Sequence, residues 1–474
     1  MTEPTCAILQ TGGLQSSPDL FQARCGGLDL VERHVLGLHY AGIHQIYIYD
    51  PKGHWKPIGR VLQLEGTTVQ AVRELPEFPS TGVIWLRADA VVHKQLIGLV
   101  KSAEKATVVC GRPGHGAKGG TSSDGFLDVG DEQWTGVAFF PAAVRAELVK
   151  SLGNDSESGD IQTIHARLDK EKTWKKSSEG GFFRKIRDRR DVRDAERLLF
   201  HSLRKPQDGL IARTFNRPLS LPVSRLLAHT HLTPNQLTVL NAGFAVAAAL
   251  VLFLGHPVFG WGLWLSGALG GLLIQACSVY DGCDGEIARV KFQYSHLGDW
   301  LDTIFDDICN CLFFAGVAAW SYQYTGHTYF IWMGLAAFVG QWIANVVMYY
   351  YLIKVAGTGN NQDYQLGSPD KPGGGLVGRI LNKLKYLTKR DFHLFTFMIL
   401  GFAGLLWVGA YFIFVSAMIA ATILSIQHVQ LLLRLRREKH QKQAAGEKRD
   451  TKPPSDRRDT KQLSGEKREG KHGG

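Results

Sequence analysis

Long apolar segments in the C-terminal half constrain the fold of this chain more than any other feature. The six segments cover roughly residues 235–254, 259–280, 299–322, 329–353, 392–408 and 411–433. A helix needs about 20 apolar residues to cross a hydrocarbon core about 30 Å thick, and most of these segments reach that length. The sequence therefore predicts a polytopic α-helical membrane domain of about six transmembrane helices, with boundaries near residues 233–435.

Lys and Arg are distributed unevenly among the connections between these segments. The connections GHPVFG, QYTGHT and WVGAY contain none, whereas the 281–298 connection carries Arg289 and Lys291 and the 354–391 connection carries seven Lys and Arg residues. Basic connections usually face the cytoplasm. We therefore predict an integral protein of the inner (cytoplasmic) membrane, with both termini and the 281–298 connection on the cytoplasmic side. The N-terminal MTEPTCAILQ has no charged-then-apolar leader, so no secretory signal is expected.

Residues 1–200 have a different pattern, in which short apolar runs alternate with amphipathic stretches. QIYIYD and VIWLRAD are typical of strands, and LDLVERHVLGLHYAGI is typical of a helix. This alternation predicts a soluble α/β (Rossmann-like) domain built on a parallel sheet. Residues 201–232 are expected to lie at the membrane interface. Residues 436–474 are charged and lack apolar periodicity, so we expect a basic disordered tail.

The formal net charge is +11, and the basic excess lies in the segments that flank the apolar middle. A basic segment directly after an apolar helix favours anionic membrane lipids over nucleic acid as its partner. We therefore predict membrane lipids, and no nucleic acid, among the partners. The seven cysteines form no CxxC pair, so neither a disulfide framework nor a zinc site is indicated.

Acidic residues gather where the second and third predicted spans meet. Asp281 and Asp284 are three residues apart at the end of one span, and Asp302 and Asp306 are four apart at the start of the next. These spacings place each pair on one helix face, and a short turn would let the pairs face each other. Close carboxylates need cations between them, and their hard oxygens suit Mg²⁺, Mn²⁺ or Ca²⁺. The sequence therefore predicts a site for two ions, which would suit phosphoryl transfer.

Three further residues of this stretch support a ligand site. Arg289 offers a permanent positive fork for a diphosphate, and Gly285 and Gly298 remove side chains where a ligand approaches the helices. Two other interpretations are solvated helix ends and an ion-conducting path. Solvated ends explain one or two acids but not two facing pairs, and a conducting path would need matching acids deeper in the other spans.

The pattern Asp281-x-x-Asp284-Gly285-x-x-Ala288-Arg289, followed by Gly298-x-x-x-Asp302-x-x-x-Asp306, resembles the signature of the CDP-alcohol phosphotransferases. The six spans and the LTPNQLT segment are also similar to this family. The resemblance implies a transferase that uses two Mg²⁺ or Mn²⁺ ions and moves a substituted phosphate from a CDP-alcohol donor to an acceptor hydroxyl, releasing CMP. It implies that the four aspartates hold the ions and that Asp306 is the catalytic base.

The same resemblance implies roles for other residues. The CDP and its diphosphate would be bound by Asp284, Gly285, Ala288, Arg289, Gly298, Asn235 and Thr238. The acids Glu286, Asp299 and Asp307 have no family role and are expected to be solvated or to support the site. An acceptor such as an inositol phosphate would be bound by basic residues, with Arg213, Arg217, Arg225, Lys389 and Arg390 as candidates. A role for each as a positive-inside anchor is equally open. A homodimer is also expected from the resemblance.

The two-domain layout resembles enzymes that fuse an inositol-1-phosphate cytidylyltransferase to a di-myo-inositol phosphate phosphate synthase, which implies a nucleotidyltransferase-like domain over residues 1–200. The cytidylyltransferase signature is degenerate. Its glycine-rich loop, LQTGGLQSSPDLFQARCGG, offers only Arg24, and Lys185 and Arg187 stand where the family has metal-binding acids. Asp89 is the remaining metal candidate. An active cytidylyltransferase, a relic, a regulatory nucleotide-binding module and a docking platform all stay open.

Two donor classes also stay open. CDP-diacylglycerol would make the product a phospholipid such as a phosphatidylinositol phosphate, whereas CDP-inositol would make it a soluble diester. A non-catalytic membrane scaffold with a nucleotide-sensing N-terminal domain is the alternative from another functional class. The intact aspartate signature argues against that scaffold.

Overall fold

The computed structural model describes residues 6–11, 23–51, 53, 55, 59–101, 107–111, 128–129, 132–146, 173–176, 182–204, 208–359 and 390–450. The chain divides into two compact units. The first comprises Met1–Phe244, Leu272–Asp302 and Lys383–Met398, and the second comprises Ala245–Gly271, Thr303–Asn382 and Ile399–Gly474. The N-terminal residues and parts of the C-terminal helices thus belong to the same unit.

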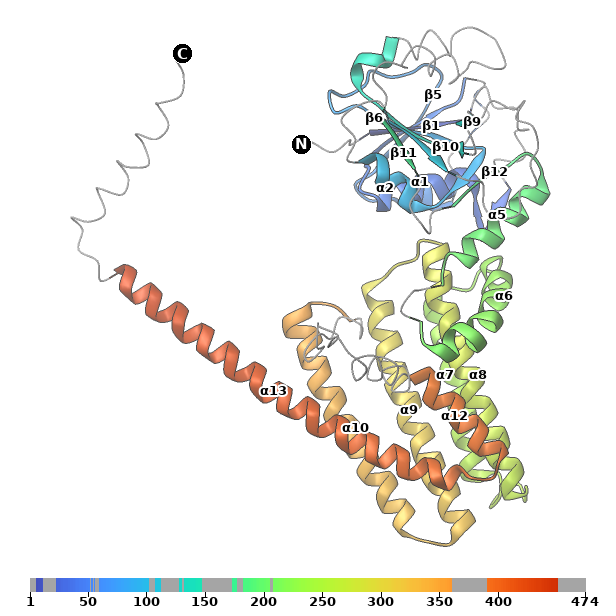
Figure 1. The fold of residues 1–474 in the computed structure, drawn as a ribbon, viewed down its shortest axis with the longest axis vertical. Helices are drawn as coiled ribbons and strands as arrows, with labels where there is room; N and C mark the ends of the chain where they lie inside the picture. The colour runs from blue at the N-terminus through green and yellow to red at the C-terminus, as the bar shows by residue number, and fades with distance from the viewer. Residues whose placement is uncertain are drawn as a thin grey trace. The chain divides into compact units, whose positions relative to one another are not determined.

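The N-terminal part of the first unit is built on a sheet with the strand order β11-β8-β10-β6-β1-β4-β5 (Figure 1). The parallel strands around β1 (Cys6–Gln10) are β4 (Gln45–Tyr49), β5 (Thr68–Val72) and β6 (Val83–Arg87). The other strands are β8 (Thr107–Gly111), β9 (Asp128–Val129), β10 (Glu132–Phe140) and β11 (Thr173–Lys176). Because β10 is antiparallel to both β6 and β8, the sheet is mixed, and the predicted parallel pairing holds around β1.

The core of this α/β domain follows from continuous apolar strands. All five residues of β1 and of β6 are buried, as expected for central strands covered on both faces. Helices α1 (Leu30–Tyr40) and α2 (Lys94–Lys101) contribute Val31, Val35 and Leu96 to the same core. Two short ribbons complete the domain: β2 (Arg24–Cys25) pairs with β3 (Leu28–Asp29), and β7 (Ala90–Val92) pairs with β12 (Phe183–Lys185).

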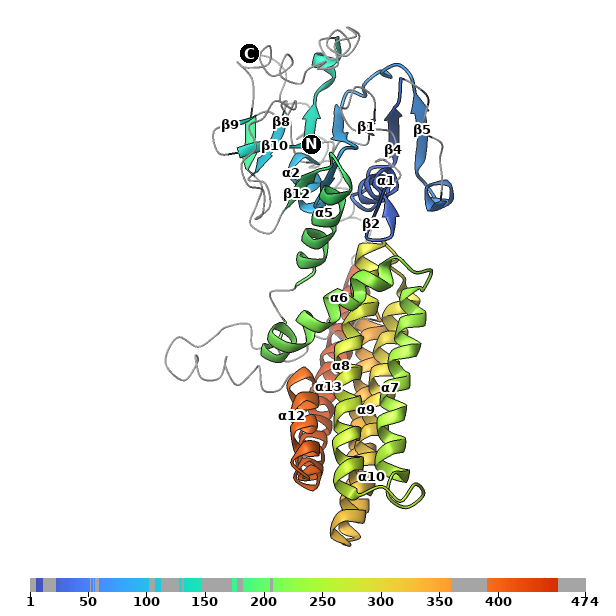
Figure 2. The same ribbon diagram turned by 90° about the vertical axis from the view of Figure 1, so that its right-hand side faces the viewer.

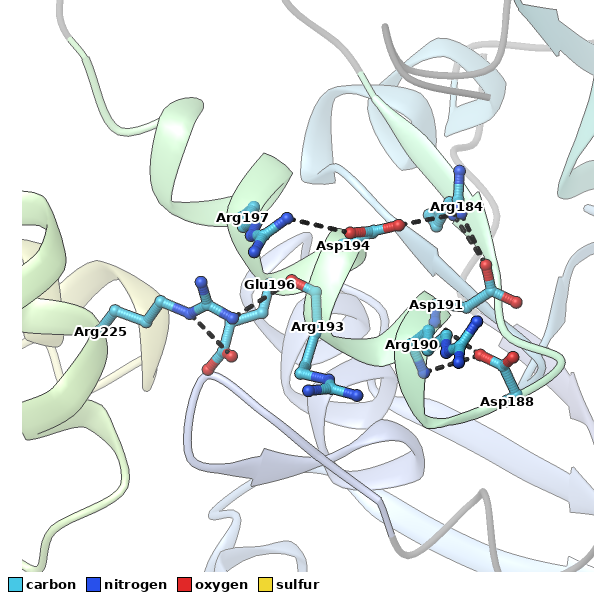
Figure 3. A network of polar contacts seen from close by, with 9 residues as sticks. All are labelled: Arg184, Asp188, Arg190, Asp191, Arg193, Asp194, Glu196, Arg197 and Arg225. Atoms are coloured by element: carbon cyan, nitrogen blue, oxygen red, sulfur yellow. Dashed lines mark hydrogen bonds and ion pairs between the residues drawn. The ribbon is translucent and has the colours of Figure 1, made fainter. Parts of the chain in front are cut away.

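Helix α5 (Arg189–His201) follows this domain and is held by charged contacts at its start and near its middle (Figure 3). Asp188 caps it by accepting from the backbone N–H groups of Arg190 and Asp191, the usual role of an N-cap aspartate. Figure 3 also shows Glu196 on α5 accepting from Arg225 of α6 (Arg217–Ala228), with Nε 3.1 Å from the carboxylate. Glu196 therefore links α5 to α6.

The remaining described residues are almost entirely helical (Figures 1 and 2). The helices are α7 (Pro234–Leu254), α8 (Leu263–Val290), α9 (His296–Thr325), α10 (Tyr329–Tyr351), α12 (Arg390–Phe402) and α13 (Leu406–Asp450). Two π-helical turns precede α6 and follow α10, η4 (Ala212–Asn216) and η5 (Leu352–Ala356). The described part of the chain has five helices long and apolar enough to cross a membrane: Pro234–Leu254, Leu263–Val290, His296–Thr325, Tyr329–Ala356 and Leu406–Leu433.

Two predicted segments differ from the structure. The fifth predicted span falls on α12, whose 13 described residues extend about 20 Å, less than the thickness of the hydrocarbon core. The helix ends before Gly404, whose φ of 71° only glycine adopts readily. The tail expected to be disordered from residue 436 is helical as far as Asp450, because α13 continues without a break beyond its apolar part.

Small residues let helices approach closely within the second unit. A Cβ on Gly316 of α9 would lie 3.3 Å from Leu252 of α7, and one on Gly401 of α12 would lie 2.5 Å from the carbonyl of Gly267 on α8. Such small-residue contacts are typical of helices packed in a membrane, where van der Waals contact replaces the hydrophobic effect. Helix α10 packs along α13 in the same unit.

Candidate active site

Three of the four predicted metal ligands converge between α8 and α9. One carboxylate oxygen from each of Asp281, Asp302 and Asp306 lies within 4.8 Å of the other two. Asp281 comes from the last turns of α8, and the other two lie one turn apart on α9. Oxygens that bind one Mg²⁺ or Ca²⁺ at about 2.0–2.6 Å lie within about 5 Å of each other. The three carboxylates therefore fit a divalent cation, and they are oxygen donors of the kind that Mg²⁺ and Mn²⁺ prefer.

Asp284, the fourth predicted ligand, is not part of this cluster. Its side chain is buried, with Oδ2 accepting from Thr238 Oγ1 at 2.5 Å and Oδ1 accepting from the Gly285 N–H at 2.5 Å. A buried carboxylate needs such donors to compensate for lost hydration. Thr238, which we had expected to contact CDP, is thus a hydrogen-bond partner of Asp284.

Polar residues recur every three positions on α7 and face the acidic residues. Asn241 Nδ2 donates to Asp281 Oδ1 at 3.2 Å, and Asn235 Oδ1 would lie 3.1 Å from a Cβ on Gly298. Gly298 therefore allows Asn235 to approach the start of α9. Our sequence analysis did not select Asn241. Its signal was the spacing with Asn235 and Thr238, which puts three polar side chains on one face of an otherwise apolar helix.

Gly285 makes room for Arg289 one turn further along α8. A Cβ on Gly285 would lie 3.3 Å from Arg289 Nη1. The Arg289 Nε is buried and has no hydrogen-bond partner among the described residues. A buried donor without a partner is costly, so it indicates a site for an anionic group. Ala288 contributes through its carbonyl, which accepts from the Gln293 N–H at 2.8 Å and closes the end of the helix.

Arg217 is held by two acids. Its Nε donates to Asp208 Oδ2 at 2.9 Å, and its Nη1 donates to Glu286 Oε1. Glu286 is fully buried and also accepts from Ser220 Oγ at 2.9 Å, so it is not a solvated acid. A buried charge of this kind is normally paired. Sequence analysis missed Glu286 and Asp208 as partners, since nothing in the spacing of Asp208 connects it with α8.

The other basic candidates lie in different surroundings. Arg390, at the start of α12, has Nη1 3.5 Å from Asp281 Oδ2 and so lies beside the cluster. Arg225 is paired with Glu196, and Arg213 lies in η4. Lys389 lies outside the described residues. Of the predicted acceptor-binding residues, the structure places Arg390 near the three aspartates.

The remaining acids have separate roles. Asp307 is buried and accepts from the Tyr349 hydroxyl at 2.5 Å, so it is not solvated. Asp299 lies in the first turn of α9, where a negative charge is favourable to the helix dipole.

The metal candidate of the α/β domain does not fit a metal ion. Asp89 follows β6 and is almost fully buried, and both of its carboxylate oxygens accept from Arg87, at 2.9 and 2.7 Å. A bidentate guanidinium occupies the lone pairs that a cation would use. Arg24 is exposed, and its Nε lies 3.8 Å from Asp29 Oδ1. Most of the glycine-rich loop that precedes it lies outside the described residues.

Comparison with known sequences places the aspartate cluster in a family. The sequence model of the CDP-alcohol phosphatidyltransferase family matches residues 231–427, a range that contains the three clustered aspartates, Arg289 and Arg390. Residues 231–427 are therefore similar to the CDP-alcohol phosphatidyltransferase family. The domain they form is called the CDP-alcohol phosphatidyltransferase domain below, and the expected resemblance is confirmed.

Several known proteins are similar to this chain. The bifunctional IPC transferase and DIPP synthase of Aquifex aeolicus is 29% identical over 241 residues, which are 49% of this chain and 47% of that protein. The phosphatidylinositol phosphate synthase of Corynebacterium glutamicum is 31% identical over 113 residues, 24% of this chain and 47% of that protein. The chain thus spans about half the length of these relatives. The structure of the inositol-1-phosphate CTP transferase from T. maritima has a TM-score of 0.32 and 15% identity, covering 42% of this chain and 95% of that one.

Proposed function

We propose that the CDP-alcohol phosphatidyltransferase domain moves a substituted phosphate group from a CDP-alcohol to an acceptor hydroxyl and releases CMP. The observation that carries this proposal is the convergence of Asp281, Asp302 and Asp306 within 4.8 Å in a domain of that family. Two ions, Mg²⁺ or Mn²⁺, held by these residues and by Asp284, would polarise the phosphoryl oxygens and offset their negative charge.

Four side chains have further roles in the proposed reaction. Asp306 accepts the proton of the acceptor hydroxyl as its oxygen bonds to the β-phosphorus and the bond from that phosphorus to the CMP oxygen breaks. Arg289 binds the diphosphate through its buried guanidinium. Asn241 holds Asp281 in place, and Thr238 does the same for Asp284.

The acceptor is proposed to carry a phosphate that Arg390 binds, since Arg390 is beside Asp281. Arg217 is better suited to an anchoring role, because Asp208 and Glu286 already occupy its guanidinium. The names of the Aquifex and Corynebacterium relatives support an inositol phosphate as the acceptor class. The active site is proposed to face the cytoplasm, in a homodimer of the inner membrane.

The α/β domain is proposed not to make the CDP-alcohol itself. The Arg87–Asp89 pair supports this, because nucleotidyl transfer needs a metal that Asp89 has no free oxygen to hold. The donor would then come from a separate enzyme that joins CTP to a phosphorylated alcohol. The Aquifex relative favours the alternative, a bifunctional protein that makes CDP-inositol and then uses it.

Release of CMP by the purified full-length protein tests the proposal. The reaction would contain Mg²⁺, an inositol phosphate and either CDP-diacylglycerol or CDP-inositol, with an Asp302→Asn variant as the matched control. Turnover with the lipid donor alone would identify a phospholipid synthase, and turnover with CDP-inositol alone a soluble-diester synthase. Release of CMP from neither donor would contradict the proposal for both donor classes.

A further inference from the structure

The turn between α8 and α9 contains a strained residue. Phe292 has a φ of 52°, and it is the one non-glycine residue with positive φ in the described part of the chain. The Gln293 N–H to Ala288 carbonyl bond, 2.8 Å, closes the helix end in a motif whose left-handed position is usually glycine. A left-handed conformation costs a residue with a Cβ about 1–2 kcal/mol. Such strain persists only where surrounding contacts hold it.

Contacts from the α/β domain hold this turn. Arg60, in the short helix η2 (Gly59–Gln63), donates from Nη1 to the Lys291 carbonyl at 2.5 Å and from Nη2 to the Phe292 carbonyl at 2.7 Å. The Tyr40 hydroxyl donates to the Phe292 carbonyl at 3.1 Å, and the two rings stack with centroids 5.7 Å apart. All of these residues lie in the same compact unit.

Arg33 of α1 adds a buried contact. Its Nη1 donates to the Val290 carbonyl at 3.1 Å, and its Cζ lies 6.0 Å from the centre of the Phe292 ring. Three successive carbonyls at the end of α8 are therefore bound by arginines of the α/β domain. The last carbonyls of a helix have no partner within it and carry the negative end of its dipole, which guanidinium groups complement.

The turn connects the two helices that carry the clustered aspartates. Arg289 directly precedes Val290, and Asp281 lies two turns earlier on α8, while Asp302 and Asp306 follow the turn on α9. Lys291 also donates from Nζ to the Thr230 carbonyl at 2.7 Å, which ties the turn to the connection between α6 and α7. A change in the turn would therefore alter the separation of the clustered carboxylates.

We infer that Arg60, Arg33 and Tyr40 are positioning residues, through which the α/β domain caps α8 and keeps the three aspartates at the separation that the transferase reaction needs. This inference rests on the proposed function, and it assigns the α/β domain a role that requires no nucleotidyl transfer. The inference predicts that loosening the turn weakens metal use and turnover.

The test compares full-length Arg60→Ala and Arg60→Lys with Arg73→Ala, which removes an exposed arginine of the same domain directly after β5. Hydrogen exchange of residues 290–298 should rise in Arg60→Ala and stay at the wild-type level in Arg73→Ala. The maximal rate of CMP release should fall by about tenfold to a hundredfold in Arg60→Ala, because small misplacements of catalytic groups have effects of that size. The Mg²⁺ concentration for half-maximal rate should rise, and Arg60→Lys should recover part of both losses.

Three results would overturn the inference. The first is unchanged exchange at residues 290–298 in Arg60→Ala. The second is faster exchange there with an unchanged rate and Mg²⁺ requirement. The third is an equal loss in Arg73→Ala. Absence of CMP release by the wild-type protein would instead contradict the proposed function, and the exchange measurement would still test whether Arg60 holds the turn.

Discussion

The α/β domain and the CDP-alcohol phosphatidyltransferase domain each carry acidic residues that sequence analysis selected as metal ligands, and their surroundings differ. Asp89 is buried with a bidentate Arg87, so its charge is already neutralised. Asp281, Asp302 and Asp306 instead converge on each other, and none of the three is buried. Arg390 approaches Asp281 at 3.5 Å.

This difference teaches that the partner of a carboxylate decides its chemistry more than its position after a strand or in a helix. An acid whose oxygens are both occupied by a guanidinium contributes to folding, because separating a buried pair is costly. Acids that face one another repel unless a cation lies between them. We therefore expect changes at Asp89 and its partner to affect stability, and changes at the aspartate cluster to affect metal use and turnover.

The largest effect is expected for Asp306→Asn. Removing the base should lower the rate of CMP release by about 10²–10⁴-fold, since general bases contribute factors of that size. Asp299→Asn, on the same helix and outside the cluster, serves as the matched control. A steady-state CMP assay compares the two, and thermal unfolding checks that both variants are folded. Wild-type turnover in Asp306→Asn would remove Asp306 as the base.

Arg87→Ala should destabilise the α/β domain strongly. It leaves the Asp89 carboxylate buried without its partner, a change that costs about 3–5 kcal/mol in free energy of unfolding. Denaturant unfolding of the full chain, with hydrogen exchange of β6 as the local probe, measures the loss. The double variant Arg87→Met, Asp89→Leu should recover most of it. An unchanged free energy of unfolding in Arg87→Ala would contradict the assignment of Asp89 to a structural pair with Arg87.

The α/β domain should also lose stability in acid through His34. Burial lowers the pKa of His34 to about 4, its Nε2 lies 2.6 Å from the Ala90 carbonyl, and Arg33 and Asp89 are the nearby charged groups. The unfolded chain, with a histidine pKa of about 6.5, binds the proton more tightly between these values. Stability is therefore full above about pH 6.5 and falls as pH decreases, by about 2 kcal/mol from pH 7 to pH 5.

Unfolding of wild type and His34→Gln at both pH values measures this contribution. The acid sensitivity should be smaller in His34→Gln by about the amount assigned to His34. Equal pH dependence in the two proteins would show that another group is responsible.

The smallest effect is expected for Asn241→Ala. Loss of the hydrogen bond to Asp281 should raise the Mg²⁺ concentration for half-maximal CMP release about tenfold, as for other residues that orient metal ligands. Gln323→Ala provides a control in the same part of the chain, because Gln323 donates to the carbonyl of Phe253 at the far end of α7. A changed donor KM with an unchanged Mg²⁺ requirement would contradict the orienting role of Asn241.

Much of the candidate site could be predicted because it depends on local spacing. Asp281 and Asp284 are three residues apart on one helix, and Asp302 and Asp306 are four apart on the next, so each pair lies on one helix face. A short turn between the two helices then brings the two faces together. Long apolar segments likewise predicted four of the five candidate membrane helices and most of the apolar part of the fifth, Leu406–Leu433. These features need no information from distant parts of the chain.

Other features depend on contacts between distant residues. Nothing near Glu286 indicates that Arg217 binds it, and nothing near Phe292 indicates that Arg60 holds its carbonyl. The spacing of Asp284 within α8 likewise does not show that Thr238 of α7 donates a hydrogen bond to its carboxylate. The C-terminal end of α12 depends on the positive φ of Gly404, which hydropathy does not report.

Binding of Mn²⁺ to the full-length protein, followed by electron paramagnetic resonance, tests the contrast between the two acidic regions most directly. Wild type, Asp302→Asn and Asp89→Asn would be titrated under the same conditions. The account predicts that Asp302→Asn weakens Mn²⁺ binding by at least about tenfold, because a ligand is lost, while Asp89→Asn binds as wild type does. Loss of binding in Asp89→Asn with wild-type binding in Asp302→Asn would contradict it.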